Sequence, residues 1–340
     1  MAFKRAAMFT DIHLGLKGNS QEHNKMCLEF VDWMITEAKK FNAETCIFLG
    51  DLFHQRNSIN VLTFDYGIKL IEKLSQNFET VYLIVGNHDL FYRSSRDIHS
   101  INYAKKYHNV KVLDDITKID DCLFLPFLVK DEHKNLDFSG IKYVFGHLEL
   151  PGYMLNNMIE MPEHGKETQE MFNKCEFVFS GHFHKRQVKK LQSGTEIHYI
   201  GNTFPHNFSD SWDANRGIVL FEHSTNELQY VNWAHCPTYK DGSLSNILRD
   251  HNVYCGYRTT LKAILDIDIA VEDINFIRET LRQKYKMTDF IVRGGSSAFD
   301  SSFDESSCEI QSVDQLVNEQ ILKLETTLDT NLLLEIYNSL

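Results

Sequence analysis

Short apolar runs alternate with amphipathic stretches from the start of the chain to about residue 235. Runs of this length, bounded by glycine and polar residues, are typical of buried strands, whereas apolar residues spaced three and four apart predict helices. We predict helices over 20–40 and 61–77 and strands over 6–11, 45–51, 80–87, 110–114, 141–147, 176–182, 197–202 and 217–222. Strands that alternate with helices indicate a layered α/β fold in which helices cover buried sheets.

The pattern changes near residue 237, where Pro237 and Gly242 interrupt the series. Residues 250–293 predict a small α+β unit, with a strand over 257–269, a helix over 271–286 and a strand over 289–294. The organisation that we expect is a main domain over 1–236, a smaller domain over 237–295, a linker over 296–309 and a helix pair over 310–340.

The predicted linker holds six serines and four acidic residues but no lysine or arginine, so we expect a flexible, solvated segment. Beyond it, apolar residues repeat at helical spacing in two groups, which predicts two short amphipathic helices. The first group is Val313, Val317, Ile321, Leu324 and Leu328, and the second is Leu333, Ile336, Tyr337 and Leu340. Such a pair can fold back on the main body or dock on a partner, and we favour a partner.

Composition narrows the class of protein further. A chain of 340 residues with 43% hydrophobic and 24% charged residues is typical of soluble globular proteins. No apolar run approaches the roughly 20 residues of a membrane span, and the N-terminus does not resemble a secretory signal, so we expect a cytoplasmic protein without a membrane anchor. The seven cysteines form no C-x-x-C pair, which favours reduced core cysteines over disulfides or a zinc–thiolate site.

Five of the predicted strands end in residues with metal-ligand chemistry. In chain order these are Asp11 and His13, Asp51 and His54, Asn87 and His88, His147, and His182 and His184. Because ligands bind at the carboxyl ends of strands in open α/β sheets, we expect the five ends to converge on one crevice. One such ending would be weak evidence, but their repetition predicts a metal site.

The types of ligand select the metal. Carboxylate, amide and imidazole groups without thiolate favour Mn²⁺, with Fe²⁺, Mg²⁺ and Zn²⁺ as alternatives. The candidates outnumber the ligands of one ion, so we predict two divalent ions that share a carboxylate, an arrangement that clamps a phosphoryl group during in-line displacement. The net charge of −12 counts against a general nucleic-acid-binding surface. Two divalent ions, however, carry more positive charge than Asp11 and Asp51 carry negative charge, so the site itself would attract phosphate.

The series D-x-H (11–13), G-D (50–51), G-N-H-D (86–89), G-H (146–147) and G-H-x-H (181–184) resembles the signature of the calcineurin-like metallophosphoesterase superfamily. Within it, "GDLFH" and "GHFHKRQ" are similar to the SbcD-type nuclease subunits of bacteria and phages. The short second unit, the acidic linker and the terminal helices resemble the phage members most. The resemblance implies two central β-sheets flanked by helices, with 237–295 as a small α+β capping domain that helps to orient duplex DNA.

The resemblance also implies a role for each site residue. One ion would be held by Asp11, His13, Asp51 and His184, and the other by Asp51, Asn87, His147 and His182, with Asp51 bridging. His88 would contact the scissile phosphate and help the leaving group to depart, and His54 would lie close by as a supporting or phosphate-contacting residue. Arg93, Lys185 and Arg186 are candidate contacts to the DNA backbone.

By resemblance we expect an Mn²⁺-dependent nuclease of DNA repair and recombination, a 3′→5′ exonuclease on duplex DNA and an endonuclease on single strands. The terminal helices would dock on an SbcC-type coiled-coil ATPase, and helices near 61–107 would form a homodimer. A phage-encoded protein would work in the cytoplasm of its bacterial host.

Two alternatives stay open at this stage. The same scaffold also serves small-molecule phosphodiesterases and protein phosphatases, and an inactive scaffold could recruit the ATPase. We expect the other ten histidines, among them His206, to have surface or packing roles, and we assign no role to Gly201 and Asn202.

Overall fold

The computed structural model describes residues 2–163 and 167–294. The described residues up to Val292 form one compact unit. The predicted linker over 296–309 and the predicted helix pair over 310–340 lie outside the described residues. Within the residues that are described, no helix is long and apolar enough to cross a membrane.

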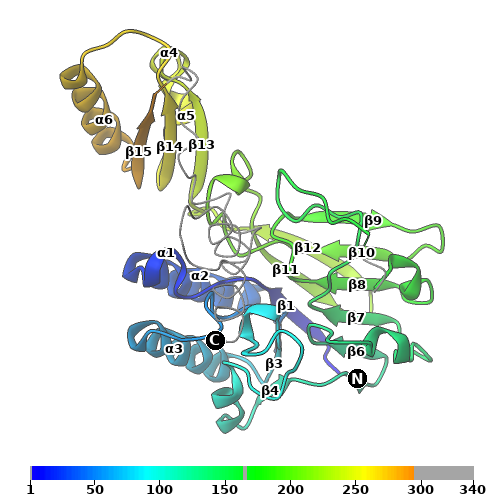
Figure 1. Cartoon of the computed structure of the whole chain (residues 1–340). Coiled ribbons are helices and arrows are strands. Elements are labelled where there is room, and N and C mark those ends of the chain that lie inside the picture. Colours follow the sequence, from blue (N-terminus) through cyan, green and yellow to red (C-terminus); the bar gives the residue numbers. More distant parts are fainter. Residues whose placement is uncertain (1, 164–166, 295–340) are drawn as a thin grey trace, which may run out of the picture. The chain divides into compact units, whose positions relative to one another are not determined.

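One six-stranded sheet has the strand order β12-β11-β1-β2-β3-β4 (Figure 1). The bounds are β1 (Arg5–Phe9), β2 (Thr45–Phe48), β3 (Thr80–Ile84), β4 (Val110–Leu113), β11 (Gly217–Glu222) and β12 (Glu227–Asn232). Strands β1 to β4 are parallel, while β11 is antiparallel to both β1 and β12. Because β1, β2 and β3 run the same way, the residues that follow them emerge at the same edge of the sheet.

The second six-stranded sheet has the order β5-β6-β7-β8-β10-β9. Its strands are β5 (Thr117–Ile119), β6 (Cys122–Leu125), β7 (Tyr143–Gly146), β8 (Phe177–Ser180), β9 (Gln187–Lys190) and β10 (Glu196–Tyr199). The four inner strands are parallel, and β5 and β9 pair antiparallel at the two sides. The segments after β7, β8 and β10 therefore also leave from a common edge.

The two sheets pack face to face through a buried core that both contribute to. Met8 and Ile47 of the first sheet and Phe124 and Phe145 of the second belong to this cluster. Aromatic rings account for much of the layer, and the Phe124 and Phe145 rings stack with centroids 5.3 Å apart. Since a packed interior of this kind deforms little, it holds the edges of the two sheets in a fixed relation.

Helices cover the other face of the first sheet. These are α1 (Leu16–Asn19), α2 (Gln21–Lys40) and α3 (Val61–Asn77). Phe30 and Leu70 on their buried sides join Phe9 and Phe48 of the strands in one core. Both long helices begin at a residue whose side chain accepts a backbone N–H: Ser20 for α2 and Asn60 for α3.

The outer face of the second sheet is covered by long connections that contain short helical turns. Tyr153 and Phe172 from these connections pack on Val178 and Ile197 of the strands. The turns of the unit are η1 (Asn87–Asp89), η2 (Asn102–Lys106), η3 (Glu132–Asn135), η4 (Gln169–Phe172) and η5 (Phe208–Asp210). The prediction of two central sheets flanked by helices is confirmed.

A third, three-stranded sheet with the order β13-β14-β15 follows these two sheets in the chain. Its elements are β13 (Thr238–Ser243), α4 (Leu244–Arg249), α5 (His251–Tyr254), β14 (Thr259–Ile264), α6 (Val271–Tyr285) and β15 (Asp289–Arg293). Leu244, Leu261, Leu281 and Phe290 form a hydrophobic cluster of its own. The segment around Gly242, interpreted from the sequence as an interruption, is instead a strand, because β13 pairs in parallel with β14 through its backbone.

The remaining differences from the predicted elements are the short helices α1, α4 and α5 and four strands. β5, β6, β9 and β12 were not predicted, and three of them are short or carry exposed polar residues at the side of a sheet. The six cysteines within the described residues are all buried and free, as the absence of C-x-x-C pairs indicated.

Candidate metal centre

The carboxyl ends of five strands from the two sheets meet and bring the predicted ligands together. Asp11 and His13 follow β1, Asp51 follows β2, Asn87 follows β3, His147 follows β7, and His182 and His184 follow β8. A direct link joins the two sheets here, since the backbone N–H of His182 donates to Oδ2 of Asp11 at 3.0 Å.

Asp51 lies in the middle of this group and is almost completely buried. Its Oδ2 lies 3.8 Å from Nε2 of His13 and 3.3 Å from Nε2 of His147. Its Oδ1 accepts the backbone N–H of His88 at 2.8 Å. The carboxylate thus faces one imidazole from the first sheet and one from the second.

On the first side of Asp51 lie Asp11, His13 and His184. Nε2 of His13 lies 3.8 Å from Oδ1 of Asp11 and 3.3 Å from Nε2 of His184. Oδ1 of Asp11 is buried and accepts no hydrogen bond from any described residue. Carboxylate oxygens and imidazole nitrogens therefore face one another without enough protons between them, which is the environment of a cation.

On the second side, Oδ1 of Asn87 lies 2.9 Å from Nε2 of His147 and 3.0 Å from Nδ1 of His182. The other ring nitrogen of each histidine has a defined partner. Nδ1 of His147 donates to the Leu49 carbonyl at 2.6 Å, and Nε2 of His182 contacts Oε1 of Glu149 at 3.3 Å. These contacts leave Nε2 of His147 and Nδ1 of His182 as the nitrogens that can ligate a metal.

His88 and His54 lie beside this group as a stacked pair, with ring centroids 5.6 Å apart. Nδ1 of His88 donates to the backbone carbonyl of His54 at 2.7 Å. Because a carbonyl only accepts, Nδ1 carries the proton and Nε2 is the nitrogen that can meet a substrate. The His88 ring also contacts the His13 ring at 4.8 Å, which places it next to the candidate ligands.

Several of these residues have an unusual backbone conformation. Asp11, His13, Asp51 and His182 all have positive φ, between 48° and 81°, which costs non-glycine residues free energy. Hydrogen bonds from Asp11 N to Gly50 O and from Asp51 N to Oδ2 of Asp89 hold this geometry. Strain of this kind accumulates at functional sites, where side chains must point in one direction.

Gly86 and Gly181 permit the close approach of the loops. A Cβ at Gly86 would collide with the side chain and backbone of Asp51, and a Cβ at Gly181 would collide with Thr10 and Leu49. The glycines of the G-N-H-D and G-H-x-H motifs are therefore required by packing against the neighbouring loops.

Asp89 connects the loops after β2 and β3. Its completely buried carboxylate accepts the backbone N–H groups of Asp51, Leu52 and Gly86, each at 3.0 Å. Burial, together with the charge of Asp51, raises the pKa of Asp89 to about 6. The residue holds the backbone around Asp51 and caps the turn that carries Asn87 and His88.

The two imidazoles that face Asp51 differ in their protonation. Burial lowers the pKa of His13 well below its usual range, and the charge of His88 lowers it further, so the ring is neutral and able to ligate. Burial also lowers the pKa of His147, but the charge of Asp51 and its hydrogen bond outweigh this and raise that pKa to about 9. The residues present fit two divalent ions, because carboxylate oxygens, an amide oxygen and imidazole nitrogens lie around Asp51, and an ion can displace the proton of His147.

Two residues near the group were missed from the sequence. Glu149 stands two residues after His147, so the segment 146–150 contained the signal. His206 is 2% exposed, and one ring nitrogen each of His13, His184 and His206 lie within 4.8 Å of one another. Asn202, to which no role was assigned, donates its backbone N–H to the carbonyl of His184 at 3.1 Å.

The three predicted DNA contacts differ in their surroundings. Arg93 is exposed and Lys185 is half-buried. Arg186 packs its guanidinium on the Tyr230 ring at 4.7 Å and donates to Ile200 O and to Oδ1 of Asn232. Arg186 is thus engaged within the protein, whereas Arg93 is open to solvent.

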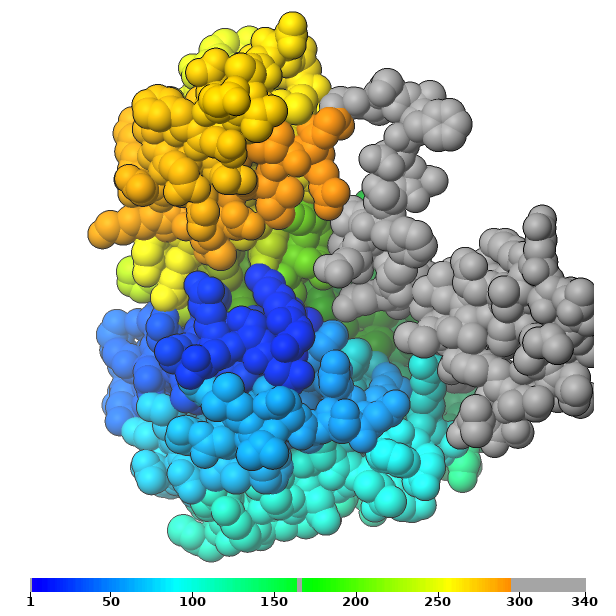
Figure 2. Space-filling model, turned by 60° about the vertical axis from the view of Figure 1, so that its left-hand side comes forward, coloured from blue at the N-terminus to red at the C-terminus, as the bar shows by residue number. Residues whose placement is uncertain are grey.

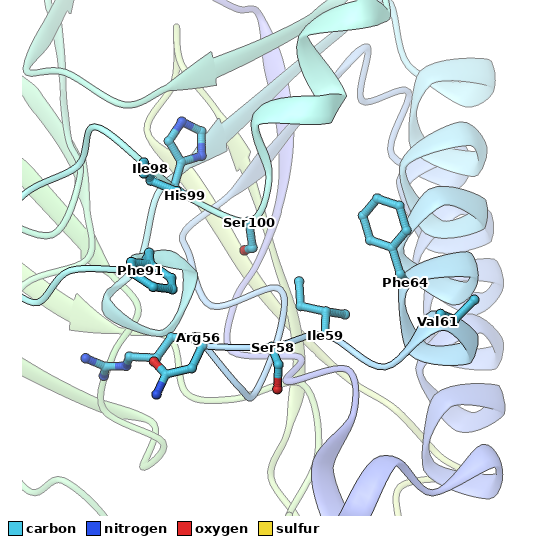
Figure 3. A pocket seen from close by; sticks show the side chains of 10 residues that line it. Arg56, Ser58, Ile59, Val61, Phe64, Phe91, Ile98, His99 and Ser100 are labelled. Carbon is cyan, nitrogen blue, oxygen red and sulfur yellow. The ribbon is translucent and has the colours of Figure 1, made fainter. Parts of the chain in front are cut away.

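A pocket of about 350 Å³ lies between the segment 56–64 and the segment 91–100. Phe64, Phe91 and Ile98 face a common space in Figure 3, and Arg56 stands at its side. Burial lowers the pKa of Arg56, and so does the nearby charge of Arg93. The pocket therefore combines apolar walls with the guanidinium group of Arg56.

The chain is similar to several known proteins. Exonuclease subunit 1 of Enterobacteria phage T4 is 28% identical over 230 residues, which is 65% of this chain and 65% of that protein. The matched stretch thus spans just under two thirds of the relative. Among solved structures, a dimetal phosphatase from Danio rerio has a TM-score of 0.42 at 12% identity, over 65% of this chain and 93% of that one. The nuclease MPE of Pseudomonas putida has a TM-score of 0.33 at 16% identity, over 64% and 84% of the two chains.

The model of the calcineurin-like phosphoesterase family matches residues 4–186. This stretch begins just before β1, ends after the G-H-x-H motif and contains all seven candidate ligands. Since the match covers more than half of the chain, the protein belongs to the calcineurin-like phosphoesterase family.

Proposed function

We propose that the protein is a nuclease that hydrolyses the phosphodiester bonds of DNA with the help of two divalent ions, Mn²⁺ foremost. The position of Asp51 supports the proposal most strongly. Its Oδ2 lies within 3.8 Å of both His13 and His147, on opposite sides of the group. A carboxylate between two sets of ligands is the feature that a two-ion centre needs.

In this proposal Asp11, His13, Asp51 and His184 hold one ion, and Asp51, Asn87, His147 and His182 hold the other. The ions, when bound, lower the pKa of water and stabilise charge on the phosphoryl oxygens. The protein contributes the orientation of the ligands, because His147 and His182 are fixed by Leu49 O and Glu149. Asn87 ligates without adding negative charge, which keeps the site attractive to phosphate.

His88 acts on the substrate. Its Nδ1 is held by the carbonyl of His54, so Nε2 meets the scissile phosphate. In the protonated state Nε2–H donates to a phosphoryl oxygen and can pass its proton to the leaving 3′ oxygen. His54 supports this arrangement through its carbonyl and its stacked ring.

The sequence identity of 28% to a phage exonuclease subunit supports DNA, rather than a small molecule or a phosphoprotein, as the substrate. We propose 3′→5′ exonuclease action on duplex DNA and endonuclease action on single strands, in repair and recombination. Arg93 and Lys185 would contact the DNA backbone beside the site. The same contact by Arg186 stays a prediction. Residues 1–236 would be the nuclease domain and 237–295 a capping domain, which the separate sheet of β13, β14 and β15 supports.

A partner ATPase of the SbcC type and a homodimer complete the proposal. The relative is by name a subunit, which supports a complex. Exposed apolar side chains around the pocket support a second copy as its cover: Val61 is 85% exposed, Ile98 54% and Phe91 42%. Val61 begins α3, and Phe91 and Ile98 follow η1; the light-blue segment that contains α3 is on the near side in Figure 2.

The substrate class is tested by incubating the protein with end-labelled linear duplex DNA, a nucleotide phosphodiester and a phosphopeptide, each with Mn²⁺ and with and without the ATPase. The proposal predicts cleavage of DNA, lost in Asp51→Asn. If the nucleotide or the phosphopeptide is hydrolysed while the DNA is left uncut, the protein is a small-molecule phosphodiesterase or a protein phosphatase instead. Failure to hydrolyse all three substrates would favour an inactive scaffold.

A further inference from the structure

The loop after β10 carries a buried histidine that no hydrogen bond explains. His206 is 2% exposed, and neither Nδ1 nor Nε2 has a hydrogen-bond partner among the described residues. A buried polar group without a partner costs about 1–3 kcal/mol, so such a residue requires an explanation. Contact with substrate does not supply one, because the ring is withdrawn from solvent.

The ring of His206 faces the first side of the metal centre. Its centroid lies 5.4 Å from that of His13 and 5.3 Å from that of His184, edge to face in both pairs. One nitrogen from each of the three rings lies within 4.8 Å of the other two. Nitrogens at about 2.1 Å from one tetrahedral ion are about 3.4 Å apart. Nε2 of His13 and Nε2 of His184 already have this spacing, at 3.3 Å, and the ring of His206 would move toward them when an ion binds.

The loop that carries His206 is built to hold it there. Its backbone N–H donates to Oδ2 of Asp210 at 3.1 Å. Asp210 and Asn202 are held in turn by the fully buried Arg216, whose Nε donates to Oδ1 of Asn202 at 2.6 Å. This network fixes the backbone of His206 and leaves both of its ring nitrogens free.

We infer that His206 is a third imidazole ligand of the ion held by Asp11, His13, Asp51 and His184. Three imidazoles at one ion and two at the other make the two positions different in kind. Imidazole suits Zn²⁺ and Fe²⁺ better than it suits Mg²⁺ or Mn²⁺. The first position would therefore prefer the softer ions, while the position at Asn87 would accept the harder ones.

The inference rests on the proposed two-ion centre, and isothermal titration calorimetry separates the two ideas. Metal-free wild-type protein, His206→Phe and His206→Gln are titrated with Zn²⁺ and with Mn²⁺, and folding is checked by circular dichroism. The variant His206→Phe keeps an aromatic ring against Phe204. The variant His206→Gln is used if His206→Phe does not fold. His198→Phe is the matched control, since His198 is equally buried but hydrogen-bonds to Tyr230 at 2.7 Å.

We expect two ions per wild-type chain, and in the His206 variants a loss of affinity of about 10–100-fold at one position, with the other unchanged. The loss should be larger for Zn²⁺ than for Mn²⁺, and absent in His198→Phe. Unchanged affinities in a folded His206 variant, or an equal loss in the control, would overturn the role of His206. A wild-type protein that binds no ion would overturn the two-ion centre itself.

Discussion

Nε2 of His147 lies 3.3 Å from Oδ2 of Asp51, and both side chains are almost completely buried. Burial raises the pKa of Asp51, but the charges of His147, His88 and His13 and the hydrogen bond with His147 together outweigh it and hold that pKa well below its usual range. The same pairing raises the pKa of His147 to about 9. In the metal-free protein at neutral pH, His147 is therefore protonated and compensates the charge of Asp51.

Metal binding is expected to release this proton. A ligating Nε2 cannot carry a proton, so an ion competes with H⁺ for His147. Affinity at that position should rise with pH by up to about tenfold per unit and level off near pH 9. Calorimetry in buffers with different ionisation enthalpies measures both the affinity and the protons released. If the metal affinity does not change between pH 7 and 9, the ion does not displace a proton from His147.

The stability of the metal-free protein should also depend on pH. The pKa of His147 is about 9 in the folded protein against an ordinary value of 6.5, so its protonation favours folding. This contribution is fully present below about pH 6.5 and is lost as pH rises through 9. We expect the melting temperature to fall over that range without metal, and to fall less in His147→Gln. An equal pH dependence in the two proteins would assign the effect to other groups.

His88→Gln should separate chemistry from metal binding. His88 is absent from both proposed ligand sets, and its ring is held outside them by His54 O. We expect cleavage of DNA to slow by about 10²–10⁴-fold, the usual contribution of a proton-transfer group, with metal affinity unchanged. Single-turnover rates and calorimetry measure the two effects. Loss of a bound ion in the variant would place His88 among the ligands instead.

Glu149→Gln should weaken metal binding without removing a ligand. Oε1 of Glu149 meets Nε2 of His182 at 3.3 Å, which orients the ring so that Nδ1 faces Asn87. Loss of a residue that holds a ligating histidine typically costs about 10–100-fold in affinity. The exposed Glu160, which follows in the same long connection, provides the control variant Glu160→Gln. If Glu149→Gln and Glu160→Gln bind metal with equal affinity, His182 does not need Glu149 to orient its ring.

Asp89→Asn should destabilise the loops of the centre. The carboxylate accepts three backbone N–H groups, and an amide offers one acceptor oxygen and places its NH₂ against the remaining donors. We expect a loss of about 2 kcal/mol in the free energy of unfolding, measured with urea. The exposed Asp65, paired with Lys69 on α3, serves as the control through Asp65→Asn. A variant as stable as this control would show that Asp89 is dispensable for the fold.

Most of the architecture follows from the pattern of apolar residues. The predicted helix over 61–77 coincides with α3, and that over 20–40 begins one residue before α2. Parallel strands with buried faces appear as continuous apolar runs, and their carboxyl ends share an edge, so the sequence predicts that the residues after these strands meet. The choice of seven ligand candidates among them came from the family resemblance. β13 was missed because it is a polar strand that pairs through its backbone, and β12 was missed because its alternation of exposed and half-buried residues is short.

His206 was missed for a different reason. It stands seven residues beyond the end of β10, in a loop whose course depends on the buried network of Arg216, Asp210 and Asn202. Nothing in the local sequence distinguishes it from the other histidines that were assigned packing roles. Its approach to His13 and His184 appears only when both sheets are assembled, since the three residues are far apart in the chain.

The sharing of Asp51 between two ions is tested most directly by anomalous diffraction from crystals soaked in Mn²⁺. We predict two anomalous peaks about 3.5–4 Å apart, on either side of the Asp51 carboxylate, one beside His13 and His184 and the other beside Asn87, His147 and His182. Crystals of Asp51→Asn should lose at least one of them. A single peak, or two peaks that do not flank Asp51 in the wild-type protein, would contradict the two-ion centre.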